Sequence, residues 1–361
     1  MAVGGCLTSL VRRAIAPAVV AVGMTILSFA AARASEVTVT ETGSTLIFPL
    51  FEAWTAAYAK IDPDLHMTIS ASGSGAGIAQ ALAKNVHVGA SDAYISDNQA
   101  MANPHLLNIP LVISAQTVQT NLPELRGRSL RLNGPVLAGI YSGTVREWDA
   151  SPLVGLNPGI PLPHHIIVPI RRADSSGDTF IFTQFLTFST PAWENSVGYG
   201  TMVKWPETAG SLTAAGNRGM LQVLAHTPYA VGYLGISFED DADKAGLITA
   251  MLANQEGKFL LPTPATISAA AARLTPRTPP DERMSLVFAP GPDSYPLINY
   301  EYALVSEQQQ NPRVAEAISS FLLWCISPYG GSAASFLTPV HFIALPTPIH
   351  ARTELQIIKI Q

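Results

Sequence analysis

Hydrophobic and polar positions follow the same order at three places in the chain: a strand-like run, a turn rich in Gly and Ser, and an apolar stretch with helical spacing. In the first, residues 37–40 alternate like a strand, Gly43-Ser44-Thr45 forms the turn, and Pro49 stands in the first turn of a helix. Apolar side chains then recur at i, i+3 and i+4, which predicts one buried helix face: Leu46, Leu50, Phe51, Trp54, Ala57 and Tyr58. The pattern is typical of an α/β protein.

The second unit predicts a strand over 68–71, a turn at 72–75 and a helix over 76–84, and a further strand then ends at Ser91-Asp92. Each Gly/Ser turn stands before a helix, whose first turn has unpaired N–H groups and a partial positive charge from the aligned peptide dipoles. Such a turn suits an anion, although a single serine there is usually only a helix cap. Strand ends in open α/β sheets are also where ligands bind.

The third unit carries charge as well. A strand is expected over 165–170, and the turn that follows it holds Arg171 and Arg172, with Asp174 and Asp178 close by. Cations and hydrogen-bond donors favour an anion, whereas the two carboxylates oppose one. The alternative is that both arginines are ordinary surface cations.

Length and composition indicate a large folded protein. The 361 residues exceed what one core usually serves, so two domains are expected. Apolar residues make up 48% and charged residues only 13%, the reverse of the balance in a disordered chain, so compact folding is expected.

The first 34 residues have the pattern of a signal peptide. Arg12 and Arg13 precede an apolar run over 14–32, and a small-x-small site ends at Ala34, so cleavage before Ser35 is expected. The alternative is an uncleaved membrane anchor. Cys6 lies before the apolar run and is therefore not a lipid-attachment cysteine at a cleavage site. A periplasmic or extracellular location follows.

Removal of that segment takes away three arginines and no acid, which changes the formal charge from −5 to −8. No basic stripe is present to release counterions, so a nucleic-acid partner is not expected. An anionic ligand would have to be held by local dipoles and one or two arginines rather than by net charge.

Motifs for catalysis and metal binding are missing from the sequence. It contains no G-x-x-x-x-G-K-[ST], no G-x-S-x-G and no H-E-x-x-H, whereas a Ser/His/Asp triad assembles in space and sequence spacing does not test for it. His164-His165 is interpreted as a loop end rather than a metal site, and Cys325 as a buried structural thiol with no disulfide partner in the mature chain. No catalytic residue, metal or cofactor is therefore predicted.

Seven segments together resemble the periplasmic phosphate-binding proteins that serve high-affinity phosphate ABC transporters, the PstS type. They are "TGSTLIFPLFEAW", "SGSGAGIAQ", "VGASDAYIS", "LAGIYSGTVREWD" with "LNPGI", "RRADSSGDTFIFTQFL", "YPLINYEYALV" and "FLLWCIS". They follow the family's order over residues 36–361, and their wording is most similar to the actinobacterial branch. Relatives there are often lipoproteins, from which this chain departs by lacking the lipid-site cysteine.

The resemblance implies a two-domain α/β binding protein of type II, with two mixed sheets flanked by helices, joined by two crossovers, and with the ligand in the cleft. The crossovers are expected near "NIPLVISAQ" and "PDSYPLINY". One domain would comprise residues 35–112 plus 296–361, and the other residues 113–295.

The resemblance also implies which residues bind phosphate. The expected contacts come from eight residues: Thr45, Leu46, Ser74, Asp92, Arg172, Ser176, Gly177 and Asp178. Ser44 and Asp174 are expected to support them, with Asp174 pairing with the binding arginine. Many relatives carry Thr at position 178, so Asp178 either accepts a second ligand proton or only caps the helix and orients nearby donors.

The leading hypothesis is a monomeric binding protein that captures inorganic phosphate and passes it to the membrane subunits of an ABC transporter, without catalysis. A secreted phosphate-ester hydrolase is the first alternative, and a binder of another oxyanion such as sulfate or molybdate is the second. Phosphate carries protons at neutral pH and sulfate does not, so an ionised Asp92, which can only accept, favours phosphate.

Overall fold

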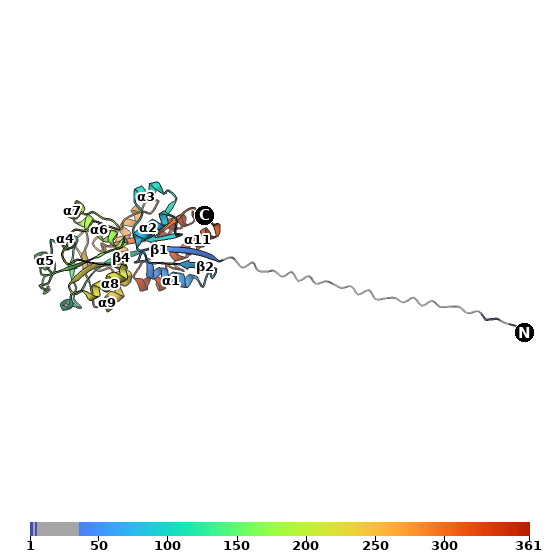
Figure 1. Cartoon of the computed structure of the whole chain (residues 1–361), viewed down its shortest axis with the longest axis horizontal. Helices are drawn as coiled ribbons and strands as arrows, with labels where there is room; N and C mark the ends of the chain where they lie inside the picture. The colour runs from blue at the N-terminus through green and yellow to red at the C-terminus, as the bar shows by residue number, and fades with distance from the viewer. Residues whose placement is uncertain (3, 6–35) are drawn as a thin grey trace. The chain divides into compact units, whose positions relative to one another are not determined.

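A long buried strand, β4 (Leu106–Thr120), runs through the middle of the computed structural model (Figure 1). The structure describes residues 1–2, 4–5 and 36–361. The apolar run over 14–32 and the expected cleavage site at Ala34 lie outside the described residues. Helices α4 to α9 lie toward one end of the molecule, and α1, α2, α3 and α11 lie toward the other (Figure 1).

The described strands form a nine-stranded mixed sheet and a small three-stranded sheet. The large sheet has the order β2-β1-β3-β12-β4-β8-β6-β7, with β9 paired to β4, and the small sheet has the order β11-β10-β5. The other strands are β1 (Val37–Gly43), β2 (Leu65–Thr68), β3 (Val88–Ser91), β5 (Arg131–Leu132), β6 (Val168–Arg172), β7 (Leu212–Ala214), β8 (Ala230–Gly235), β9 (Ile248–Thr249), β10 (Met251–Ala253), β11 (Phe259–Leu260) and β12 (Ile298–Ser306).

Strand β4 belongs to both halves of the large sheet. Residues 106–115 pair antiparallel with β12, whereas residues 116–120 pair antiparallel with β8. On one side β12 continues to β3 and β1, and on the other β8 continues to β6 and β7. The mixed α/β architecture expected from the sequence is present, with the two halves joined through one shared strand. The exact domain limits at 112/113 and 295/296 stay a prediction.

Helices connect and cover these strands. They are α1 (Phe48–Tyr58), α2 (Ser74–Leu82), α3 (Asp97–Ala102), α4 (Gly134–Ser142), α5 (Ser151–Leu156), α6 (Gly177–Ser189), α7 (Pro191–Glu194), α8 (Gly216–His226), α9 (Glu239–Lys244), α10 (Pro264–Leu274), α11 (Pro312–Ile326), α12 (Ala334–Leu337) and α13 (Thr347–Ile357). In α1, Leu50, Phe51 and Trp54 are fully buried, as the helical spacing predicted, and Pro49 lies in the first turn.

Two strand boundaries differ from the sequence prediction. The strand expected over 68–71 is β2 and ends at Thr68, because its ladder partner β1 pairs with residues 65–68. The strand expected to end at residue 170 is β6 and continues through Arg172, because β7 supplies a parallel partner for Arg171 and Arg172. A ladder partner brought from forty residues away leaves no local signal.

The two arginines are not surface cations, so that alternative was wrong: both residues are buried. Successive residues of a strand point to opposite faces of the sheet. The Arg171 guanidinium lies over the Trp205 ring, 5.5 Å from its centroid, and only Arg172 reaches the polar network described below. Cys325 is buried in α11 with a free thiol, as expected.

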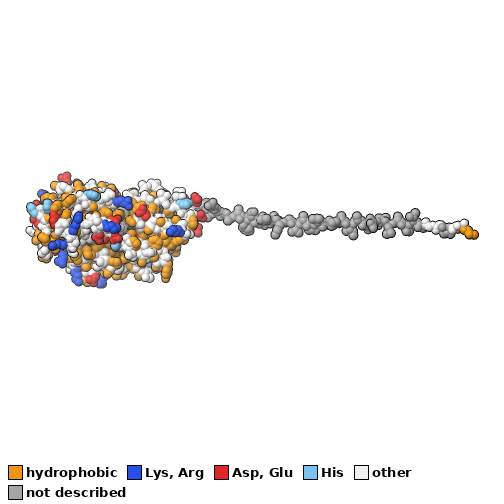
Figure 2. Space-filling view, turned by 90° about the horizontal axis from the view of Figure 1, so that it is seen from below, with side chains coloured by type: hydrophobic (Ala, Val, Ile, Leu, Met, Phe, Trp, Pro, Cys, Tyr) orange, Lys and Arg blue, Asp and Glu red, His pale blue; other side chains and the backbone are white. Residues whose placement is uncertain are grey.

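Charged side chains are scattered over the face shown in Figure 2 among apolar and neutral ones. Glu147, Asp149 and His164 gather on exposed segments, where His164 Nδ1 lies 2.9 Å from Asp149 Oδ2 and 3.8 Å from Glu147 Oε2. Exposed acids commonly gather in this way without an ion, so the expectation of no metal at His164 stays a prediction. Within the described part of the chain, no helix is long and apolar enough to cross a bilayer.

Candidate functional site

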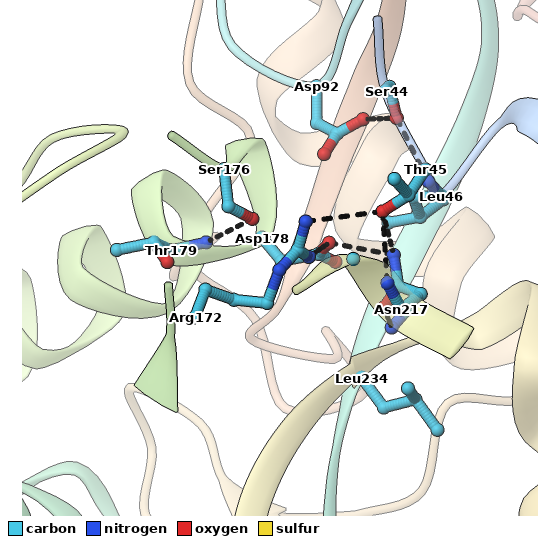
Figure 3. A network of polar contacts seen from close by, with 12 residues as sticks. Ser44, Thr45, Leu46, Asp92, Arg172, Ser176, Asp178, Thr179, Asn217 and Leu234 are labelled. Atoms are coloured by element: carbon cyan, nitrogen blue, oxygen red, sulfur yellow. Dashed lines mark hydrogen bonds and ion pairs between the residues drawn. The ribbon is translucent and has the colours of Figure 1, made fainter. Parts of the chain in front are cut away.

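The N-terminal ends of α1, α2, α6 and α8 meet at one polar site, and Figure 3 draws the part of its network that involves α6, α8 and the turn before α1. Asn217, in the first turn of α8, donates its backbone N–H to Thr45 Oγ1 (3.2 Å), which lies in the turn before α1. Gly75, in the first turn of α2, donates its backbone N–H to Ser175 O (3.0 Å), in the turn before α6. Turns that lie far apart in the sequence therefore line a single polar site.

Ser44 closes the first of these turns and orients an acid. Its Oγ accepts the backbone N–H groups of Leu46 (3.0 Å) and Ile47 (3.3 Å) and donates its own proton to Asp92 Oδ1. Gly43 makes this arrangement possible: its φ is +149°, and a Cβ there would lie 1.9 Å from Ala90 O. The ends of β1 and β3 therefore lie close enough for Ser44 to reach Asp92.

Ser74 and the start of α6 enclose Asp92 from the other directions. Ser74 Oγ accepts the Asp92 backbone N–H (3.2 Å). A Cβ added at Gly177 would lie 2.3 Å from Asp92 Oδ2 and 2.4 Å from Ser74 Oγ, so only glycine allows this approach. Ser176 caps α6 by accepting the Thr179 backbone N–H (3.3 Å). The N-terminus of α6 thus lies directly against Asp92 and Ser74.

Arg172 is held by two carboxylates. Its Nε and Nη2 bind Asp174 Oδ1 (2.8 Å) and Oδ2 (2.5 Å), its Nη1 binds Asp178 Oδ2 (2.5 Å), and its Nη2 also donates to Thr45 Oγ1 (3.3 Å). The side chain is 1% exposed. Burial lowers the pKa of Arg172, but Asp174 and Asp178 outweigh that effect and raise it above its ordinary value. Burial likewise opposes ionisation of Asp174, yet Arg172 holds the Asp174 pKa below its ordinary value.

Asp178 uses both of its oxygens within the protein. Oδ2 accepts from Arg172 and from Asn217 Nδ2 (2.8 Å), and Oδ1 accepts from Gln116 Nε2 (3.1 Å). Asn217 is itself fixed, because its Oδ1 accepts the Gly235 backbone N–H (2.8 Å). These contacts favour the interpretation in which Asp178 orients the donors around it.

Asp92 is in the opposite situation. Its Oδ1 accepts from Ser44, but its Oδ2 faces Gly177, is buried and has no hydrogen-bond donor among residues 36–361. Burial, followed by the charge of Asp178, raises the pKa of Asp92 to about 6, although its hydrogen bonds and Arg172 oppose that rise. An acceptor without a donor is costly in a buried place, so this oxygen is suited to a ligand that brings a proton.

The site as a whole has few cations for an anion to meet. One guanidinium, Arg172, lies among the carboxylates of Asp92, Asp174 and Asp178. An anion would therefore be attracted mainly by backbone N–H groups and hydroxyls at the helix N-termini, where the dipoles point inward. Binding by dipoles rather than by net charge also agrees with the negative formal charge of the chain.

The structure brings together every residue for which the sequence predicted a role in binding. The eight expected contact residues are all buried, and Ser44 and Asp174 contact them as expected of supporting residues. Which of them contact a ligand stays a prediction.

Sequence reasoning missed two of the residues that complete the network, Asn217 and Gln116. Asn217 follows the segment "SLTAAG", in which β7, a glycine turn and α8 repeat the strand–turn–helix order of the other three units, so the same pattern search could have found it. Gln116 lies inside a continuous apolar strand and carried no local signal. Its role depends on the position of α6, which only the folded chain defines.

The geometry offers no support for nucleophilic catalysis. In the described part of the chain, the hydrogen-bond partners of Ser44, Ser74 and Ser176 include no histidine, which a serine nucleophile would need as its base. Cys325 lies in α11, and burial raises the pKa of its thiol well above the ordinary value. The arrangement can bind an anion and hold a proton, and these residues show no further chemistry.

Comparison with known sequences places the chain among binding proteins. Residues 30–328 match the PBP superfamily domain. The phosphate-binding protein PstS of Haemophilus influenzae is 30% identical over 311 residues, which cover 86% of this chain and 90% of the relative. PstS of Methanocaldococcus jannaschii is 30% identical over 334 residues, which cover 87% of this chain and 84% of the relative.

Solved structures share the fold. A high-affinity periplasmic phosphate-binding protein bound with phosphate gives a TM-score of 0.69 at 21% identity, covering 88% of this chain and 93% of that protein. A phosphate-binding protein from Stenotrophomonas maltophilia gives a TM-score of 0.65 at 19% identity, covering 88% and 93%. At this level of identity the likeness concerns the architecture.

Proposed function

The chain belongs to the PstS family of phosphate-binding proteins within the PBP superfamily, and on this premise we propose that it captures inorganic phosphate and delivers it to a phosphate-import ABC transporter. It has the two-domain α/β fold of the type II binding proteins. The eight residues expected to contact phosphate would do so where the four helix N-termini meet.

The observation that carries this proposal is the state of Asp92. Its Oδ2 is buried and lacks a donor within the described part of the chain, beside hydroxyls and N–H groups that can bind oxygen atoms. Hydrogen phosphate brings both partners that such a site needs: bare oxygens for the donors and a P–O–H for the carboxylate. Sulfate at neutral pH offers only bare oxygens, so it would place an acceptor against an acceptor.

Closure of the two domains on the ligand belongs to the same proposal. The domains would comprise residues 35–112 plus 296–361 and residues 113–295, with one crossover within β4 and the other in the segment that leads into β12. Contacts such as Gly75 N to Ser175 O and Arg172 to Thr45 cross between them. A ligand that contacts Ser74 on one side and Ser176 on the other would favour the closed arrangement.

Location and partners follow from the same premise. A protein of this family would act outside the cytoplasmic membrane after removal of the expected signal peptide, as a monomer, with the membrane subunits of the transporter as partners. A nucleic-acid partner and an enzymatic activity form no part of the proposal.

Isothermal titration of the purified protein with phosphate, arsenate, sulfate and molybdate tests the proposal. Phosphate is expected to bind at least ~10³-fold more tightly than sulfate, on the scale of leaving a buried polar group unpaired. A chromogenic phosphate ester is expected to release no product. Tighter binding of sulfate or molybdate would move the function to another oxyanion, and turnover of the ester would make the protein a hydrolase.

A further inference from the structure

A second buried acid, Glu301, lies behind Asp92. Glu301 belongs to β12, where the adjacent Tyr302 pairs with Ser91 at the end of β3, next to Asp92. The register between β12 and β4 shifts between Glu301 and Tyr302. Such irregularities re-aim side chains and are common beside functional sites. Glu301 is 0% exposed, so its carboxyl group has no access to water.

The partners of Glu301 are divided between its two oxygens. Oε1 accepts from Ser114 Oγ (2.5 Å) and from Asn299 Nδ2 (2.9 Å), whereas Oε2 has no donor among residues 36–361. The antiparallel pairing of Tyr302 with Ser91 makes Glu301 and Asp92 neighbours across the two strands, and each acid has one buried oxygen without a donor among residues 36–361. Two ionised carboxylates can only accept, so a hydrogen bond between these acids requires that one of them carries a proton.

The surroundings assign that proton to Glu301. Burial, and then the charge of Asp92, raises the pKa of Glu301 well above its ordinary value, and no cation contacts Glu301 among residues 36–361 to oppose that rise. Asp92 is the titratable group that faces Glu301. Asp92 in turn faces the charges of Asp178 and Arg172 and the hydroxyl of Ser44. Arg172 and Ser44 both stabilise a negative charge on Asp92, and neither contacts Glu301.

We infer that Glu301 is a neutral carboxylic acid that donates its proton to Asp92, and that this positioning residue keeps Asp92 ionised and thereby sets the preference for phosphate over sulfate. The inference rests on the proposed function for its ligand. A carboxylate has about four acceptor positions, so the Glu301 proton and the Ser44 hydroxyl leave room on Asp92 for a ligand hydroxyl.

The reason for a neutral neighbour is electrostatic. An ionised Glu301 would place a second negative charge beside Asp92 and favour protonation of Asp92. A protonated Asp92 would become a donor and could then bind the bare oxygen of sulfate. A neutral donor avoids this and helps a buried carboxylate to keep its charge at neutral pH.

Two substitutions at position 301 separate the role of the hydrogen-bond donor from the role of the side-chain shape. In Glu301→Gln, the amide oxygen can accept from Ser114 and Asn299 while the amide NH₂ donates to Asp92, which reproduces the hydrogen bonds of the neutral acid. In Glu301→Leu, the donor to Asp92 is lost. Glu282→Gln is the matched control, because Glu282 is equally buried, burial raises its pKa to about 7, and its partners are Thr353 and Gln356 of α13.

The affinities for phosphate and sulfate are measured by titration calorimetry from pH 5.5 to 8.5. Glu301→Gln and Glu282→Gln are expected to keep phosphate affinity and selectivity within about threefold, below the tenfold change that 1.4 kcal/mol represents. Glu301→Leu is expected to lose at least ~10-fold in selectivity at pH 7, the equivalent of one pKa unit at Asp92. Its selectivity is also expected to fail at a higher pH than in the wild type.

Carboxyl ¹³C NMR of the ligand-free protein checks the proton directly, with the Glu301 signal identified by its loss in Glu301→Gln. A signal in the neutral-acid position throughout pH 5 to 8 supports the inference, and an ionised signal at pH 7 overturns it even if phosphate is not the ligand. Loss of selectivity in Glu301→Gln also overturns it, since Asp92 would then hold the proton. Failure of the wild type to bind phosphate overturns the proposed function instead.

Discussion

Arg172 and Asp92 lie in the same site, but the protein has completed the surroundings of only one of them. All three guanidinium nitrogens of Arg172, Nε, Nη1 and Nη2, donate to acceptors, which belong to Asp174, Asp178 and Thr45. Asp92 has one oxygen bound to Ser44 and another that faces Gly177 and finds no donor in the region that the structure describes. The surroundings of Arg172 are thus completed by contacts within the protein, whereas Asp92 keeps one oxygen for which the described residues supply no donor.

This difference separates affinity from specificity. A fixed guanidinium and oriented N–H groups attract any tetrahedral oxyanion, because sulfate and phosphate present oxygens of similar geometry. Under the proposed function, the Asp92 oxygen that has no donor among residues 36–361 would distinguish ligands by whether they carry a proton. The two acids beside Arg172 are compatible with an anion site, because both bind the Arg172 guanidinium and hold it in place.

The largest effect on phosphate affinity is expected from substitution of Arg172. Arg172→Ala should weaken phosphate binding by roughly 3–5 kcal/mol, because it removes a buried charge and leaves Asp174 and Asp178 without their main partner. Arg172→Lys should not restore binding, since an ammonium lacks the planar fork of donors. Titration calorimetry measures both.

Arg171→Ala is the matched control on the next residue of the same strand. Arg171 packs against Trp205 on the opposite face, so its loss should lower thermal stability while leaving phosphate affinity nearly unchanged. Equal losses of affinity at both positions would show that neither arginine has the role assigned here.

The next largest effect, on the selectivity for phosphate over sulfate, is expected from substitution of Asp92. Asp92→Asn should narrow the gap between phosphate and sulfate from at least ~10³-fold to about tenfold, because the amide can turn a donor toward a bare oxygen. Competition of sulfate against phosphate at pH 7 measures the gap. A variant that keeps the full wild-type gap would show that discrimination arises elsewhere, for instance from cleft shape.

A variant of Asp178 tests whether this acid only orients the donors around Arg172 or also accepts a ligand proton, as proposed for Asp92. Because its oxygens bind Arg172, Asn217 and Gln116, Asp178→Thr should weaken phosphate binding about tenfold, the equivalent of roughly one hydrogen bond to a charged group, at every pH from 6 to 8. If Asp178 instead accepts a second ligand proton, wild-type affinity should fall as pH rises over that range, and the variant should flatten the trend.

The sequence contained most of the completed side. The glycine and serine turns, the helix caps and the expected arginine are local features, because φ values, caps and strand ends depend on neighbouring residues. The family motifs added the expected roles of the acids Asp92, Asp174 and Asp178. All of these residues lie within short segments that the sequence pattern could identify.

The partners of those residues could not be predicted in the same way. Gln116 and Glu301 reach the site from the long strands β4 and β12, and a buried polar residue in an apolar strand has no local signal of its partner. The length of β6 depends on pairing with β7, and the Arg171 guanidinium packs against Trp205, which lies more than thirty residues further along the chain. The local sequence does not show tertiary contacts. It does not tell which strands are neighbours in the sheet, and therefore does not tell which acids lie next to each other.

The smallest expected effect is on the free energy of unfolding, to which Asp92 and Asp174 should contribute with opposite dependence on pH. Asp92 has a folded pKa of about 6, above its ordinary 3.8, so its contribution to stability is present below pH 3.8 and is lost as pH rises through 6. Asp174 has a lowered pKa, so its contribution to stability is present above pH 3.8 and is lost as pH falls below that value.

Urea unfolding of the ligand-free wild type, Asp92→Asn and Asp174→Asn from pH 3.5 to 7.5 measures both contributions. The wild type should lose stability relative to Asp92→Asn as pH rises, by no more than about 1.4 kcal/mol per pH unit for one group. It should lose stability relative to Asp174→Asn as pH falls. Slopes of the same sign would mean that the protein treats both carboxylates alike, and that the incomplete acceptor is not a distinct feature of the site.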